Sequence, residues 1–166
     1  MTHRLALAIV ALAASLTACT GGDMTMDEHL KILGNHITSA TTDLDGHKGE
    51  VAAATDVAAI ISLEGPHATK MANHFASMGS MVSDIMGCTK NGAPPSTTAM
   101  TSAILAMKND CEAHKSTLAA AANLADARAE EDRHQQLQAG KMATMTEKHS
   151  AMMAATAGYT CSSMSH

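Results

Sequence analysis

The sequence predicts an all-α protein, an up-down-up-down four-helix bundle made of two repeated αα-hairpins. Along four segments, apolar residues recur at alternating spacings of four and three, which marks one face of a helix. The 166 residues include one Phe, one Tyr and no Trp, and β-branched residues never form alternating runs, which disfavours a sheet. A motif that begins at His47-Lys48 also recurs at His114-Lys115, 67 positions later, which suggests a duplicated hairpin.

The first 18 residues predict a secretory signal peptide. Arg4 precedes an uncharged apolar segment from Leu5 to Leu16, and small residues follow. This segment is shorter than the roughly 20 residues that a membrane-spanning helix needs. Leu16-Thr17-Ala18-Cys19 resembles the lipobox of bacterial lipoproteins. The resemblance implies cleavage before Cys19, lipidation of that residue and attachment to a membrane, whereas the alternative is an ordinary signal peptide with a chance cysteine.

Residues 19–25 are expected to form a short lipidated tether, beginning Cys19-Thr20-Gly21-Gly22. In enteric bacteria, lipoproteins retained in the inner membrane carry Asp after the lipidated cysteine. This chain has Thr20, so the resemblance favours the outer membrane, facing the periplasm, over the inner membrane.

Residues 26–160 predict the bundle, and residues 161–166 a flexible tail. We call the apolar face of each helix its seam; the four seams cover residues 26–54, 57–85, 97–121 and 124–152. Asp56 and Asn123 stand at the two hairpin turns, and both residue types are good N-caps. The strongest loop signal is Asn91-Gly92-Ala93-Pro94-Pro95-Ser96. Gly65-Pro66 lies within the second seam and should kink or restart that helix.

Polar residues replace apolar ones at matching heights on all four seams. In an antiparallel hairpin, residues equidistant from the turn lie at the same height, about 13 to 17 Å from the turns at 1.5 Å per residue. The residues expected to meet there are His47, Glu64, His67, His114, Glu131 and His134. Because unpaired buried polar groups cost several kcal/mol each, we expect them to share a transition metal, with Cu, Zn or Fe as candidates. The alternatives are hydrogen-bonded Glu–His pairs that only fix helix register, or helices rotated so that these residues face water.

Glu64-x-x-His67 and Glu131-x-x-His134 each place a Glu and a His on one helical face. Two such motifs on alternate helices resemble the di-metal carboxylate sites of ferritin-like bundles. In that family the other two helices each supply a Glu, where this chain has His47 and His114. The resemblance implies a metal pair, and the exchange of Glu for His suits Zn or Cu at least as well as iron.

Other metal-ligating residue types lie along the seams. Most of the 14 Met are expected to be core packing, because Met at helical spacing fills irregular gaps. The candidates for additional soft ligands, for Cu(I) in particular, are Cys111, Met71, His74 and Met78. His29 and His36 are one position off their seam and are expected at the surface.

The cysteines suggest an oxidising compartment. Cys88 and Cys161 both follow the ends of helices at the end of the bundle away from the turns, so a disulfide between them would join the two hairpins. Cys111 lies roughly 30 Å from Cys88 along the bundle and should stay free. It could be an extra ligand or a small buried residue.

Composition and motifs narrow the function. A net charge of −5 and the lack of aromatics argue against nucleic acid as a partner. No nucleophile elbow, phosphate loop, HExxH or dinucleotide fingerprint is present, so hydrolase and nucleotide chemistry have no support, and a binding protein is favoured over an enzyme. The sequence predicts a membrane-anchored extracytoplasmic lipoprotein that binds a transition metal for storage, sensing or delivery. The main alternative is a structural or interaction lipoprotein of the envelope with a metal-free polar layer; a di-iron redox enzyme and a b-type haem protein are further alternatives.

Overall fold

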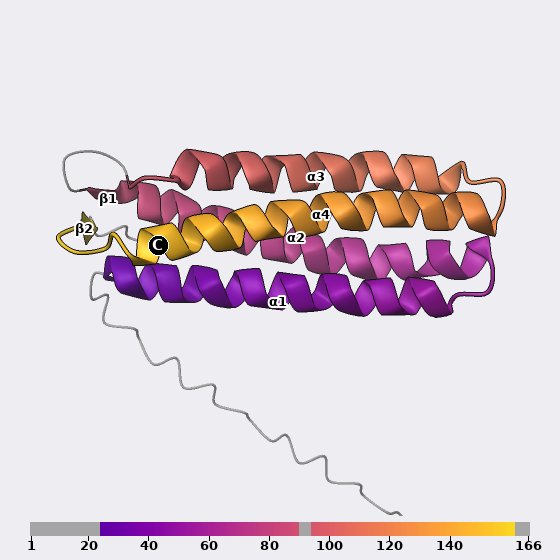
Figure 1. Ribbon diagram of the computed structural model, residues 1–166, viewed down its shortest axis with the longest axis horizontal. Helices are drawn as coiled ribbons and strands as arrows, with labels where there is room; N and C mark the ends of the chain where they lie inside the picture. The colour runs from indigo at the N-terminus through magenta and orange to yellow at the C-terminus, as the bar shows by residue number, and fades with distance from the viewer. Residues whose placement is uncertain (1–23, 90–93, 162–166) are drawn as a thin grey trace, which may run out of the picture.

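A computed structural model describes residues 24–89 and 94–161 of the chain. Its four helices are α1 (Met26–Ala53), α2 (Val57–Gly87), α3 (Thr97–Ala119) and α4 (Leu124–Met153). They run alternately up and down, and each packs against its chain neighbours, with α4 closing the ring against α1 (Figure 1). The predicted all-α four-helix bundle is confirmed.

Both hairpin turns lie at one end of the bundle, and each ends at a capping side chain (Figure 1). The Asp56 carboxylate accepts a hydrogen bond from the backbone N–H of Ala59 at 2.8 Å, and the Asn123 side chain accepts one from Asp126 N–H at 3.0 Å. A cap of this kind stabilises a helix by about 0.5–2 kcal/mol. Asp56 and Asn123 therefore fix where α2 and α4 begin, and so set the height at which their later residues meet.

The helix does not restart at Pro66, because α2 runs through this residue as one element. A proline inside a helix costs about 3 kcal/mol, since it removes one hydrogen bond and crowds the preceding turn. Pro66 is exposed, whereas Ile60, His67 and Met71 on either side of it are buried. Packing of this face on both sides of Pro66 holds the helix together.

The other end of the bundle is closed by a short antiparallel pair, β1 (Cys88–Thr89) and β2 (Thr160–Cys161). Cys88 and Cys161 face each other in this pair and form a disulfide across a separation of 73 residues. Cys161, the first residue of the predicted tail, is thus part of the folded end. The rest of that tail, residues 162–166, lies outside the described residues.

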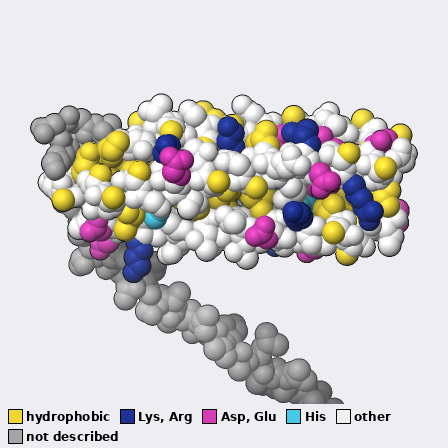
Figure 2. Space-filling view, in the orientation of Figure 1, with side chains coloured by type: hydrophobic (Ala, Val, Ile, Leu, Met, Phe, Trp, Pro, Cys, Tyr) yellow, Lys and Arg dark blue, Asp and Glu magenta, His cyan; other side chains and the backbone are white. Residues whose placement is uncertain are grey.

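The core consists of two apolar clusters. The smaller one, near the hairpin turns, contains Val51, Ala54, Ile60, Leu118 and Ala127. The larger one fills the rest of the bundle, and its largest fully buried side chains include Leu30, Leu33, Phe75, Met78, Met107 and Met145. On each of the four helices, buried polar residues fall between the residues of the smaller cluster and those of the larger one along the chain. On the face formed by α1 and α4, apolar side chains are visible along the line where the two helices meet (Figure 2).

The N-terminal predictions fall largely outside the described residues. The signal peptide, the lipidation site Cys19 and the tether up to residue 23 belong to this part of the chain. None of the helices in the described part has a stretch both long and apolar enough to cross a membrane.

Candidate metal centre

The six predicted residues, His47, Glu64, His67, His114, Glu131 and His134, come together in one layer of the core. Two imidazole nitrogens and two carboxylates form its centre. Nε2 of His47 lies 3.0 Å from Glu64 Oε1 and 3.5 Å from Glu131 Oε2. Nε2 of His114 lies 3.2 Å from Glu64 Oε2 and 3.3 Å from Glu131 Oε1. Each carboxylate thus contacts both imidazoles, one through each of its oxygens. We call these six residues the polar layer.

The other two histidines stack on the first two. The rings of His47 and His67 are parallel at 3.8 Å, those of His114 and His134 at 4.0 Å, and His67 meets His134 edge-on at 6.2 Å. All four imidazoles are at most 5% exposed. The layer therefore has two matched halves: one pair of stacked imidazoles from the first hairpin (α1 and α2) and one from the second (α3 and α4).

The central atoms are close together but are not aligned as hydrogen bonds. Among the described residues, Nε2 of His47 and of His114 have no hydrogen-bond partner, and neither do both Glu131 oxygens and Glu64 Oε1. Nε2 of His67 is likewise buried without one. Buried polar atoms are almost always hydrogen-bonded, and leaving one unpaired costs about 1–3 kcal/mol. The imidazole nitrogens and carboxylate oxygens thus converge without hydrogen-bonding to each other. Metal ligands around a shared ion have this arrangement. His47, Glu64 and Glu131 in particular form a group that could hold a metal ion.

The charges of the layer are strongly coupled. Burial alone would lower the pKa of His47 and of His114, but the carboxylates of Glu131 and Glu64 raise these values to about 9 and about 10. Burial lowers the pKa of His67 to about 4, and the neighbouring His47 adds to this effect. The pKa of His134 is lowered for the same reason, with His114 as the neighbour. Without a metal, two charged and two neutral imidazoles are therefore the favoured state near neutral pH.

A second set of residues, which the seams did not reveal, supports the layer on one side. Nδ1 of His134 lies 2.6 Å from Asp110 Oδ2, and Nδ1 of His114 lies 3.0 Å from Glu130 Oε1. Arg133 binds both carboxylates, with Nη1 2.6 Å from Asp110 Oδ1 and Nη2 2.6 Å from Glu130 Oε1. Asp110 precedes His114 by one helical turn, and Glu130 is adjacent to Glu131, so this spacing is the signal that could have identified them.

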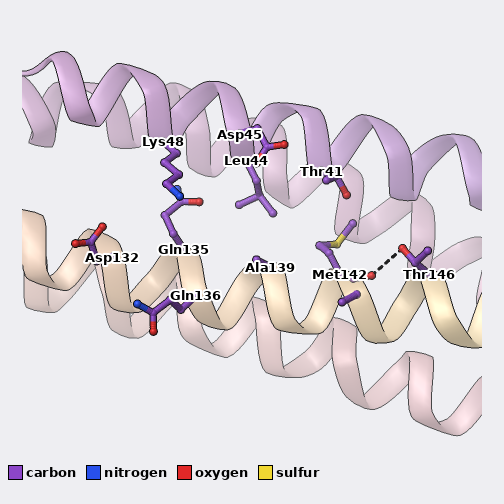
Figure 3. Close-up of a pocket in the computed structure, with 11 residues that line it drawn as sticks. Thr41, Leu44, Asp45, Lys48, Asp132, Gln135, Gln136, Ala139, Met142 and Thr146 are labelled. Atoms are coloured by element: carbon purple, nitrogen blue, oxygen red, sulfur yellow. Dashed lines mark hydrogen bonds between the residues drawn. The ribbon is translucent and has the colours of Figure 1, made fainter.

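Cavities reach the layer between three pairs of helices. One of about 390 Å³ between α2 and α3 is lined by Glu64, His67, His114 and His134, and another of about 210 Å³ between α1 and α2 is lined by His47 and His67. A groove of about 370 Å³ between α1 and α4 contains none of the six residues. In that groove Lys48 and Gln135 approach each other from opposite helices (Figure 3). A third cavity, of about 260 Å³ between α1 and α4, is lined by Glu131. The three cavities that include layer residues are therefore the relevant ones for a small ligand.

The candidate soft ligands have other surroundings. Met71 and Met78 are fully buried in the larger apolar cluster. His74 Nε2 lies 2.7 Å from Asp43 Oδ2. Cys111 is free and half-buried, accepts a hydrogen bond from Gln138 at 3.5 Å and lines the cavity between α2 and α3. Burial and the nearby Asp110 raise the pKa of the Cys111 thiol to about 12, so it stays protonated.

The surface location expected for His29 is wrong. His29 is only 7% exposed, and its Nδ1 is buried without a hydrogen-bond partner among the described residues. It lies with Cys88 and Cys161 in a group of potential ligands at the closed end of the bundle, where both sulfurs are in the disulfide. The disulfide thus lies beside the first turn of α1, and a pattern of four helices alone does not include this contact. His36 is half-exposed.

Comparison with known proteins identifies no relative. No family model, curated protein or solved structure matches this chain.

Proposed function

We propose that this protein binds a transition metal in the polar layer. The observation that carries the proposal is the convergence of His47 Nε2, His114 Nε2 and the two carboxylates, 3.0 to 3.5 Å apart and without hydrogen-bond alignment. Ligand atoms about 2.0–2.2 Å from a common ion lie at about this separation from one another. A metal would satisfy the buried atoms that have no hydrogen-bond partner in the described part of the chain.

The donor set indicates which ions would bind. Imidazole nitrogens with carboxylate oxygens suit Zn, Cu and Fe. With all imidazoles neutral the layer carries two negative charges, from Glu64 and Glu131, which a divalent ion would neutralise. Since each carboxylate places one oxygen beside His47 and the other beside His114, the layer also has ligands for two ions that share Glu64 and Glu131. The role would be storage, sensing or delivery of the metal.

We also propose that the protein works outside the cytoplasm, anchored to a membrane by lipid on Cys19. The lipobox-like Leu16-Thr17-Ala18-Cys19 supports this anchor. The Cys88–Cys161 disulfide supports an oxidising compartment, because such bonds persist mainly in exported proteins. Thr20 after the cysteine favours the outer membrane, with the bundle in the periplasm.

A metal-free polar layer is the second candidate. It is favoured by the raised pKa of His47 and of His114, since two imidazolium groups would neutralise the two carboxylates without an ion. In this case the layer would set the register of the helices in a structural or interaction lipoprotein. The two candidates differ in one measurable quantity, the metal content of the purified protein.

Elemental analysis of the purified protein tests the proposal. We expect a stoichiometric transition metal in the natural chain and its loss from a His67→Ala/His134→Ala variant. A His36→Ala/His74→Ala variant, which removes two histidines outside the layer, should retain the metal. A folded protein without metal, whose melting temperature does not change on addition of Cu, Zn or Fe ions, would refute metal binding and support the metal-free layer.

A further inference from the structure

The two halves of the polar layer supply the same ligand types but hold them differently. His114, Glu131 and His134 of the second hairpin correspond to His47, Glu64 and His67 of the first, at the repeat distance of 67 positions. The stacking distances within the two pairs, 4.0 and 3.8 Å, are nearly equal. The difference lies in the groups that contact the outer ring nitrogens, which face away from Glu64 and Glu131.

In the second hairpin both imidazoles are anchored through Nδ1. Glu130 accepts from His114 at 3.0 Å, and Asp110 accepts from His134 at 2.6 Å. The two carboxylates are buried and are joined by the Arg133 guanidinium through contacts of 2.6 to 2.8 Å. Gln138 adds a contact of 3.3 Å to Asp110. The imidazoles on this side are therefore fixed in orientation.

In the first hairpin these supports are missing. Nδ1 of His47 is buried with no hydrogen-bond partner among the described residues. Asp43 stands at the position that corresponds to Asp110, but it binds His74 at 2.7 Å and Lys70 at 3.5 Å. Leu63 occupies the position that corresponds to Glu130, and Pro66 the one that corresponds to Arg133. The first hairpin therefore has an acidic residue at one of these three positions, where it binds His74 and Lys70, and lacks the acidic and basic residues at the other two.

An anchored imidazole is a better metal ligand than a free one. A hydrogen bond from Nδ1–H to a carboxylate sets the tautomer, leaves Nε2 as the coordinating atom and increases its basicity. Loss of such a partner commonly weakens metal binding by about 10–100-fold. Access does not favour one half, because cavities border both imidazole pairs. Unequal support therefore predicts unequal affinity.

We propose that the polar layer holds two metal ions of unequal affinity. The ion on the side of His114 and His134 binds first and tightly, and the ion on the side of His47 and His67 binds second and exchanges. Both share the carboxylates of Glu64 and Glu131. This inference rests on the proposed metal-binding function and adds that Asp110, Glu130 and Arg133 are positioning residues. The protein would thus keep one resident ion and exchange the other.

Titration of the metal-free full chain with Co²⁺, followed by its visible absorption, tests the inference. We expect two ions to bind in two steps separated by at least about 10-fold in affinity, since each missing partner contributes about that factor. Asp110→Asn and Glu130→Gln should each weaken the first step by about 10–100-fold and leave the second within about 3-fold. The matched control is Asp43→Asn, the same substitution at the corresponding position of the first hairpin, which should change neither step.

A gain of affinity tests the same idea in the opposite direction, with circular dichroism to check folding, because Leu63 packs against the smaller apolar cluster. Leu63 lines the cavity beside His47, so Leu63→Glu would place a carboxylate where Glu130 stands in the other hairpin. This variant should tighten the second step and bring the two steps closer together. Two equal steps in the natural chain, a single bound ion, or equal effects of Asp110→Asn on both steps would overturn the inference while leaving metal binding intact. Absence of any Co²⁺ binding would instead refute the proposed function itself.

Discussion

The polar layer and the Met-rich part of the core occupy the same seams of the same helices, yet they are buried for opposite reasons. Around Met78 and Met107 the side chains are fully buried and apolar, and each one adds stability as it leaves water. In the layer, Glu131 and His134 are as deeply buried but lose hydration, which their neighbours must replace. Each apolar side chain therefore contributes to stability on its own, whereas the polar side chains of the layer stabilise the fold only when all of their partners are present.

The largest expected effect is the removal of one member of the set. Glu131→Ala leaves His47 and His114 with Glu64 as their remaining carboxylate in the layer, and breaking a buried ion pair in this way costs about 3–5 kcal/mol. Urea unfolding of the metal-free protein measures the loss. Replacing all six residues by apolar ones of similar size should restore most of that stability while abolishing metal binding. If the complete replacement were less stable than Glu131→Ala, the layer would not be a set of mutually dependent charges.

A cavity in the apolar region should cost slightly less. Met78→Ala removes a fully buried side chain from the larger cluster, and such truncations cost about 2–5 kcal/mol. The same urea experiment should give an equal loss at pH 5, 7 and 9 and in the presence or absence of metal, since no titrating group is involved. A loss that varies with pH would mean that Met78 is coupled to the layer.

The pH dependence of the metal-free protein gives a separate test of the layer. Above pH 6.5 the unfolded chain releases protons from His47 and His114, whereas the folded state keeps them up to about pH 9 and about pH 10, so stability falls as the pH rises. Below pH 6.5 the unfolded chain protonates His67 and His134, whereas folded His67 resists down to about pH 4, so stability falls as the pH falls.

The melting temperature, measured as a function of pH in the presence of a chelator, should therefore reach its maximum near pH 6.5. Protonated imidazoles cannot bind metal, so the stabilisation that added metal confers should increase with pH over the same range. A flat profile between pH 5 and 9 would show that the imidazoles do not titrate as a coupled set.

The apolar seams predicted the helices and the height of the layer because both depend on a regular period. Asp56 and Asn123 cap α2 and α4 as the sequence predicts. Because residues equidistant from a hairpin turn lie at the same height, counting from the first turn predicts the contact between His47 and Glu64. Asp110 was missed because it lies off the seam and binds its partner from the side. The β1–β2 pair was missed because two residues per strand are too short for a pattern.

The two hairpins are linked covalently at one end only. The chain between α2 and α3 and the Cys88–Cys161 disulfide both lie there, while the two turns at the opposite end are separate. At the turn end the hairpins meet through noncovalent contacts: the smaller apolar cluster, and the Arg128 guanidinium, which donates to Ala54 O at 2.9 Å. The polar layer lies between these contacts and the disulfide, nearer to the turns. An ion held between His47 and His114 would therefore add a second strong link between the hairpins, far along the bundle from the disulfide.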